Sequence, residues 1–225
     1  MPGGFLPGIF VVMNNQVLLS TAYLAPIQYY SKFLLYDEIY IEVHENYPKQ
    51  TYRNRCRIYG ANGGLSLSIP VKKLDVKVKT KDILIDYDTN WRKLHWKSIE
   101  SAYRSSPFFE YYQDDFMPFY EKKYKYLIDL NTDLQLMILE HLDYDVKINK
   151  TKEYKTGYEI GVDDLRDKIH PKLNINDDRF KIKNYTQVFK QKLGFIPNLS
   201  IIDLLFNEGP NTLETLKSFN SKVIS

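Results

Sequence analysis

The first part of the chain alternates between strand-like and helix-like spacing of its apolar residues. Residues 16–24 are apolar and rich in strand formers, and residues 37–45 alternate apolar with polar side chains, which is typical of a half-buried strand. Between them, residues 27–36 repeat apolar side chains at helical spacing, and Pro26 suits the first turn of a helix. The pattern predicts a strand–helix–strand unit, whose ligands would gather at the carboxyl ends of its strands, near residues 20–28.

Residues 52–71 have the pattern of a β-hairpin, and the sequence GANGG supplies residues that tolerate positive φ at its turn. Side chains along a strand point alternately to its two faces. Arg53, Arg55 and Arg57 are therefore expected on one face. Asn54 and Cys56 are expected on the other, so the single cysteine points away from the arginines that flank it.

Helical spacing dominates after residue 90. Before it, residues 74–82 form a Lys-rich connection that could serve as an edge strand, and residues 83–87 form a short apolar strand. Residues 152–183 are polar and lack a pattern, so we expect a long loop, which is usually functional or mobile. The expected helices are 91–106, 108–123, 130–144, 186–194, 201–209 and 212–219, with a short strand at 146–151. The predicted fold class is α/β: a mixed sheet that opens with a βαβ unit and a hairpin, followed by a helical C-terminal half.

Composition and charge narrow the class of protein. The chain has 225 residues, of which 44% are apolar and 26% charged, so it can bury a sizeable core. A net charge of +3 does not predict a nucleic-acid-binding face, and no apolar run is long enough to span a bilayer. One cysteine cannot form an intramolecular disulfide, which favours a reducing compartment, the cytoplasm. Residues 1–12 lack the features of a signal peptide, and we expect them to be a mobile extension of a single domain at 13–225.

Several blocks of the sequence, in their order along the chain, resemble the WbqC-like family. They are STAYLAPIQYYSKF, QTYRNRCRI, SIPVKK, NWRKLHWKSIESAYRSSPFFEYY and LGFIPNLSIIDLLFNEGPNT, and together they cover most of residues 16–215. The family pattern falls on Pro26, Tyr30, Asn54, Arg55, Trp91, His95, Pro107, Asp203, Asn207 and Gly209. Cys56 is a departure, because other members can carry asparagine at this position. A thiol at this position is therefore no nucleophile common to the family.

The resemblance implies carbohydrate or acyl-transfer biochemistry in the cytoplasm. Members of the family lie in gene clusters for O-antigen and other surface glycans, and one type has been proposed to add glycine or another aminoacyl group to a sugar. The resemblance therefore implies a transferase of surface polysaccharide biosynthesis, with a small-molecule or carrier-linked acyl donor and a sugar acceptor. No cofactor is expected, and the oligomeric state stays open.

The candidate catalytic residues are Cys56, His95 and Asn54. A thiolate at Cys56 could attack a thioester or activated carbonyl while the His95 imidazole takes and returns the proton, and Asn54 could complete an oxyanion site. The competing interpretation is structural, because free cysteines are often small buried residues and His95 shares a helical face with large apolar side chains. His44 and His170 are alternative bases.

The candidate substrate-binding residues are Arg53, Arg55, Gln28, Tyr30, Asp203 and Asn207. Arginine binds phosphate bidentately, so the arginine face could hold the phosphate of a sugar nucleotide or of a phosphopantetheine thioester. The same face could also be an ordinary solvated strand surface. Asp203 and Asn207 share one helical face, and a carboxylate among apolar neighbours needs a partner, for which we expect Arg55.

Three functions compete at this stage. The first is the transferase. The second is a non-catalytic glycan- or nucleotide-sugar-binding protein, which would stack sugars in an aromatic groove of Tyr29, Tyr30 and Trp91. The third is a nucleotidyl-type transferase, for which Lys32 is the available phosphate ligand. The dispersed histidines match no metal-ligand spacing, and no helix pattern follows GANGG, so neither a metal site nor a phosphate-binding loop is expected.

Overall fold

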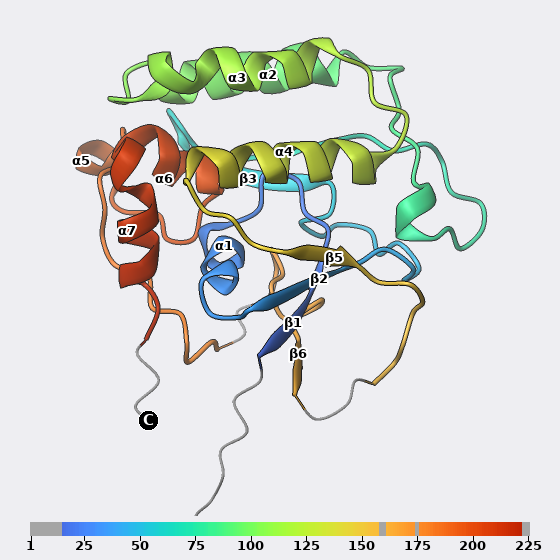
Figure 1. Cartoon of the computed structure of the whole chain (residues 1–225). Helices are drawn as coiled ribbons and strands as arrows, with labels where there is room; N and C mark the ends of the chain where they lie inside the picture. Colours follow the sequence, from blue (N-terminus) through green and yellow to red (C-terminus); the bar gives the residue numbers. More distant parts are fainter. Residues whose placement is uncertain (1–14, 158–160, 174–175, 222–225) are drawn as a thin grey trace, which may run out of the picture.

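A four-stranded parallel sheet forms one layer of the fold (Figure 1). The computed structural model describes residues 15–157, 161–173 and 176–221. The strands run in the order β5-β2-β1-β6 and comprise β1 (Gln16–Ser20), β2 (Glu38–Glu42), β5 (Ile148–Lys150) and β6 (Val162–Asp164). Helix α1 (Ile27–Phe33) connects β1 to its parallel neighbour β2, so the predicted strand–helix–strand unit is confirmed.

An antiparallel hairpin of β3 (Arg55–Gly60) and β4 (Gly63–Ser68) forms a second sheet. Its turn closes at Gly63, which has a φ of 107° that side chains with a Cβ rarely adopt. Cys56 is buried and Arg57 is exposed, so the predicted alternation of faces is confirmed within β3. The fold class predicted from the sequence is therefore the one observed.

Arg53 departs from this alternation. It precedes the first residue of β3, and only 1% of its surface is exposed. The two-residue period holds along a strand and not through the turn before it. The prediction that Arg53 shares an outward face with Arg55 and Arg57 is therefore wrong.

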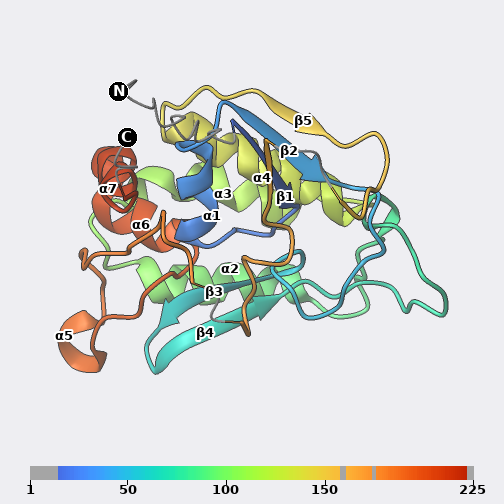
Figure 2. The same ribbon diagram turned by 90° about the horizontal axis from the view of Figure 1, so that it is seen from below.

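Helices cover both sheets. Helix α4 lies over the parallel sheet, and α2 packs against the hairpin and beside α3 (Figures 1 and 2). The helices are α2 (Trp91–Tyr103), α3 (Phe109–Glu121), α4 (Leu127–His141), α5 (Lys190–Leu193), α6 (Ile201–Glu208) and α7 (Thr212–Ser218), with short 3-10 turns at Thr80–Asp82 and Gly209–Asn211. All the expected helices are present, although α5 is shorter than the sequence pattern predicts.

The differences from the prediction lie in short segments without a strong local pattern. Residues 74–82 form no strand and end in the 3-10 turn, while residues 83–87 pair only through isolated bridges at Leu84 and Ile85. The expected long loop at 152–183 contains β6. This strand has three residues and pairs with the distant β1, so its formation depends on tertiary contacts.

One continuous core of buried apolar side chains joins both sheets to the helices. It includes Val17 of the parallel sheet, Ile58 of the hairpin and Phe206 of α6. Shared burial therefore fixes the hairpin relative to the sheet. The expected extension at residues 1–12 lies outside the described residues, and a single domain at 13–225 stays a prediction.

Gly209 provides a test of the packing between α6 and the start of α3. It ends α6 with a φ of 55°, and a Cβ at this position would lie 2.5 Å from ring atoms of Phe108. Both the backbone and the ring resist the added methyl group. We expect Gly209→Ala to lower the free energy of unfolding by about 2 kcal/mol or more, measured by urea denaturation.

The matched control is Gly157→Ala, because a Cβ at Gly157 meets no atom within 4 Å. Its effect should stay within about 0.5 kcal/mol. Equal stabilities of the two variants would contradict the described packing of Gly209 against Phe108.

Candidate functional site

The strand order reverses beside β1. From β1 the chain passes to β2 and then β5 on one side, and it later places β6 on the other side. In α/β sheets, ligands bind outside the carboxyl ends of strands at such reversals. Ser20 ends β1 and Asp164 ends β6, so the segments that follow these residues are the first place to look for a site.

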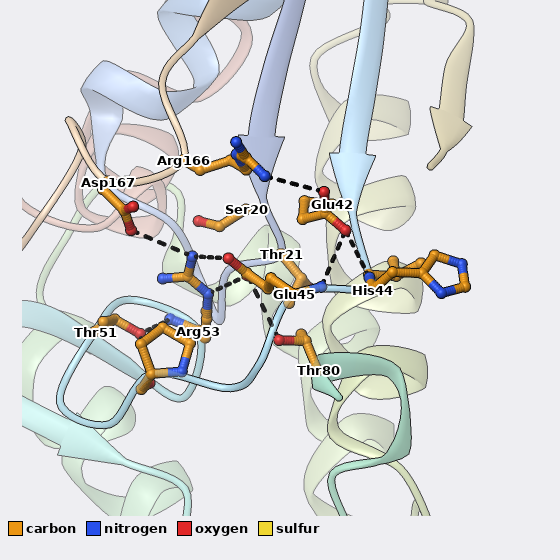
Figure 3. Close-up of polar contacts among 12 residues, drawn as sticks. Ser20, Thr21, Glu42, His44, Glu45, Thr51, Arg53, Thr80, Arg166 and Asp167 are labelled. Atoms are coloured by element: carbon orange, nitrogen blue, oxygen red, sulfur yellow. Dashed lines mark hydrogen bonds and ion pairs between the residues drawn. The ribbon is translucent and has the colours of Figure 1, made fainter. Parts of the chain in front are cut away.

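A buried ion pair lies at this end of the sheet (Figure 3). The Arg53 guanidinium donates two hydrogen bonds to the Glu45 carboxylate, with Nε to Oε1 at 2.6 Å and Nη2 to Oε2 at 2.8 Å. Asp167, in the segment after β6, lies 3.7 Å from Arg53 Nη2. Burial raises the pKa of Glu45, and the hydrogen bonds from Arg53 oppose that rise. The pair connects the segment after β2 with the turn before β3.

A second buried carboxylate, Glu42, lies at the end of β2 (Figure 3). It has no exposed surface and accepts backbone N–H groups of His44 at 2.6 Å and Glu45 at 3.1 Å. Arg166, which follows β6, donates to Glu42 at 3.2 Å and also binds Asp164. These bonds fix the chain segments that leave β2 and β6. Only the backbone N–H of His44 takes part in this network, so a role of its ring as a base stays a prediction.

A cavity of about 570 Å³ opens beside this network between the hairpin and the segment that follows β6. We call it the basic cavity, and its polar lining includes Arg55, Arg57, Ser66, His170, Lys172 and Asn198. No Asp or Glu of the described ranges lines it. The Arg55 Nε is buried and has no hydrogen-bond partner among these residues. An excess of donors with no carboxylate favours an anionic ligand.

His170 contributes a hydrogen-bond donor to the basic cavity. The backbone N–H of Lys172 donates to His170 Nδ1 at 3.1 Å, so in the neutral ring the proton is on Nε2. Burial and the nearby charges of Arg53 and Lys172 lower the pKa of His170. The ring is therefore suited to donate from Nε2 and is a poor base at Nδ1.

Cys56 borders the basic cavity but has the properties of a core residue. Only 1% of its surface is exposed, and burial raises the pKa of its thiol. Asn54 donates from Nδ2 to the carbonyl of Ile69 at 2.8 Å, which closes the base of the hairpin. The neutral thiol and the engaged amide do not support the predicted nucleophile and oxyanion donor.

His95 is a buried histidine with a tyrosine partner. Tyr23 Oη lies 2.9 Å from His95 Nδ1, and the backbone of Ser68 lies close enough to raise the pKa of the ring against the effect of burial. Tyr23 in turn contacts Tyr120 Oη at 2.8 Å. Burial lowers the pKa of His95 to about 4, so the ring is neutral at pH 7. The geometry supports the structural interpretation of His95 over a role as general base.

Comparison with known proteins identifies the family. Residues 21–176 and 170–215 match the WbqC-like protein family. The chain belongs to this family. It is also 28% identical over 232 residues to "Uncharacterized protein Rv1507c" of Mycobacterium tuberculosis, with 93% of this chain and 97% of that protein covered. No solved structure matches this WbqC-like protein.

Asp203 of the WbqC-like protein is fully buried and bonds to three side chains. It accepts from Tyr103 Oη at 2.9 Å, Tyr185 Oη at 2.6 Å and Gln187 Nε2 at 3.1 Å. The expected Arg55 partner is therefore wrong, because Arg55 faces the basic cavity instead. Asn207 bonds back to the Asp203 carbonyl at 2.7 Å. Asp203 ties α6 to its neighbours, whereas the bond of Asn207 lies within α6, and the predicted contact of both residues with substrate stays a prediction.

The expected aromatic groove is absent from the described surface of the WbqC-like protein. Tyr29, Tyr30 and Trp91 are 2–4% exposed, so none of them offers a ring face for sugar stacking. Lys32 is also buried, and its ammonium group pairs with Asp177 at 2.5 Å. Gln28 donates to the same Asp177 at 2.7 Å. A cavity of about 240 Å³ remains beside these residues, and Gln28, Lys32 and Asp177 line it. Ligand binding by Gln28 in the space after β1 therefore stays a prediction.

Within the described ranges, no helix of the WbqC-like protein is long and apolar enough to cross a bilayer. The same residues contain no group of three or more His, Cys, Asp or Glu side chains that could hold a metal ion. Sequence reasoning missed Lys172 and the buried charges of Glu42, Glu45 and Arg166. The sequence held one indication of these buried charges, which is the position of Glu42 at the end of an apolar strand.

Cys56 alkylation tests the assignment of a buried, protonated thiol. Native protein should not react measurably with iodoacetamide near pH 7, because the sulfur is buried and its pKa is raised. Intact-mass analysis should detect one label per chain after unfolding in guanidinium chloride. Rapid native labelling would instead place an exposed thiolate in the cavity and restore Cys56 as a candidate nucleophile.

The raised pKa of Asp203 leads us to predict that the stability of the protein depends on pH. Burial raises the folded-state pKa of this residue from 3.8 to about 6, so between these values the folded state binds a proton that the unfolded state has released. Stability from this group is therefore full below pH 4 and is lost as the pH rises through 6. Relative to Asp203→Asn, the wild type should lose about 2 kcal/mol between pH 4 and pH 7, measured by urea unfolding.

The matched control is Asp114→Asn, which removes a carboxylate from the exposed surface of α3. Its difference from the wild type should not vary with pH to a comparable extent. A difference for Asp203→Asn that is constant from pH 4 to pH 7 would contradict the raised pKa.

Proposed function

We propose that this WbqC-like protein is a cytoplasmic transferase of surface polysaccharide biosynthesis, which moves an acyl or aminoacyl group from an anionic donor onto a sugar. The basic cavity would hold the phosphate of the donor. The observation that carries the proposal is the lining of this cavity, where Arg55, Arg57, His170 and Lys172 supply donors and no described residue supplies a carboxylate. The transfer itself rests on the family resemblance.

The two arginines suit phosphate in different ways. The Arg55 Nε is buried without a partner, so an anion would satisfy a donor that is otherwise desolvated. The Arg57 guanidinium extends over Gly64, where a Cβ would lie 2.4 Å from its Nε. The absent side chain at Gly64 leaves room for the guanidinium beside the hairpin. Charge-assisted bonds of this kind are about twice as strong as neutral ones.

The geometry favours direct transfer without a covalent enzyme intermediate. Cys56 is protonated and buried, so the attacking atom would be the hydroxyl or amino group of the acceptor sugar. A bond forms from that atom to the acyl carbon, the bond from the acyl carbon to the donor breaks, and the proton of the acceptor goes to the leaving group. The protein would contribute binding and orientation of the two substrates.

The second candidate is a non-catalytic protein that binds a nucleotide sugar in the same pathway. The basic cavity favours it as much as it favours a transferase, since both require phosphate recognition. The burial of Tyr29, Tyr30 and Trp91 counts against the stacking mode expected for it. Release of an acylated sugar from purified protein, acyl donor and sugar would separate the two candidates.

Charge removal in the basic cavity tests the proposal. We expect Arg55→Gln and Arg57→Gln each to weaken the binding of inorganic pyrophosphate about tenfold or more, because each variant removes a charge-assisted hydrogen bond. Isothermal titration calorimetry at low ionic strength measures this effect. Added salt should weaken binding to the wild type more than to either variant.

Arg104→Gln is the matched control, because Arg104 is an exposed arginine that pairs with Glu100 on α2. It should bind pyrophosphate like the wild type. The proposal is overturned if pyrophosphate does not bind the wild type, or if all three variants bind it equally.

A further inference from the structure

The outer strand of the hairpin has a free edge next to the basic cavity. Ser200 N donates to Arg57 O at 2.8 Å, so this carbonyl is bonded outside the hairpin and not to β4. Arg57 and its cross-strand neighbour Ser66 therefore form a non-hydrogen-bonded pair. It follows that the N–H and C=O of Ser66 point away from β3, and no described residue is recorded as their partner. Peptide-like ligands commonly add to such an edge.

A second cavity of about 300 Å³ runs along this edge. It lies between β4 and the start of α2, and its lining includes Ser66, Ser68, Asn90, Trp91, Leu94 and His95. Trp91 is 4% exposed, and its Nε1 has no hydrogen-bond partner within the described ranges. A buried indole N–H normally finds an acceptor, so an acceptor supplied by a ligand would complete this groove.

Ser66 lines both cavities, which makes them neighbours along one strand. The basic cavity suits a phosphate. The second cavity presents backbone and indole groups between apolar side chains such as Leu94. A ligand that spans both would carry a phosphate at one end and an uncharged arm with amide groups at the other. The combined volume of the two cavities lies within the range of about 300–1,000 Å³ that is typical of small-molecule sites.

We propose that the two cavities form one site for the phosphopantetheine arm of an acyl thioester donor. The inference rests on the proposed function and specifies its donor. The phosphate lies with Arg55 and Arg57, the amides bond to the free edge at Ser66, and the acyl end reaches Trp91. A sugar nucleotide is the competing ligand, because the partly exposed Tyr52 of the basic cavity could stack on its base, and the calorimetry below distinguishes the two.

Titration calorimetry with phosphopantetheine, inorganic phosphate, coenzyme A and UDP-glucose tests this inference. Phosphopantetheine should bind the wild type about tenfold or more tightly than inorganic phosphate. Ser66→Pro removes the outward N–H without breaking a bond to β3, since proline is tolerated at such edge positions. It should weaken phosphopantetheine binding severalfold, and clearly more than it weakens phosphate binding. Ser66→Ala separates the loss of the side chain from the loss of the N–H.

Trp91→Phe provides a second test, because it removes the Nε1–H and keeps an aromatic ring. It should also weaken phosphopantetheine binding and not phosphate binding. The melting temperature of each variant shows whether the variant is folded. If coenzyme A binds more tightly than phosphopantetheine, the donor is linked to a nucleotide. If coenzyme A binds equally or more weakly, the donor is the arm of a carrier protein. Both results support the inference.

The opposite results are distinguishable. If phosphate does not bind, the proposed function fails together with the inference. If phosphate binds but phosphopantetheine is no tighter, or Ser66→Pro weakens both equally, only the inference fails. Preference for UDP-glucose over phosphopantetheine overturns it in favour of a nucleotide sugar. A dimer in analytical ultracentrifugation that Ser66→Pro dissociates would assign the β4 edge to a second copy of the chain and also overturn it.

Discussion

The buried ion pair between Arg53 and Glu45 is the interaction on which the placement of the site depends. Two charges are removed from water, which is costly, so the pair persists only because both bonds are made and neighbours satisfy the remaining groups. The bonds hold the turn before β3 against the segment after β2. Asn131 of α4 also donates to the Arg53 carbonyl at 2.8 Å. The start of the hairpin, and with it the face that carries Arg55, is thereby fixed relative to the parallel sheet.

The local spacing of apolar residues predicted most of the fold. Apolar spacing predicted the βαβ unit, the hairpin and the helices, because each of these elements buries one face and exposes the other. The same rule placed Cys56 on the buried face of β3 and Arg57 on its exposed face. Periodicity did not reveal β6, which is short and obtains its pairing from β1. It also misplaced Arg53, since the rule stops where the strand begins.

The candidate site was less accessible to sequence reasoning, because its parts come from distant segments. Arg55 and His170 are 115 positions apart and meet only in the folded chain. The partner of Asp203 was also assigned incorrectly, since burial of a carboxylate requires donors but does not say which ones. Tyrosine hydroxyls and a glutamine amide satisfy it here, and this leaves Arg55 available to the cavity.

The distribution of protonation states indicates what kind of chemistry this scaffold can support. Burial keeps the thiol of Cys56 protonated and the ring of His95 neutral, although each borders one of the two cavities. The groups that face the cavity are donors. A site of this composition suits a negatively charged ligand and offers no evident base. For the transfer that we propose, the nucleophile and its proton would therefore belong to the substrates, and rate acceleration would come from holding an acyl donor and its acceptor in contact.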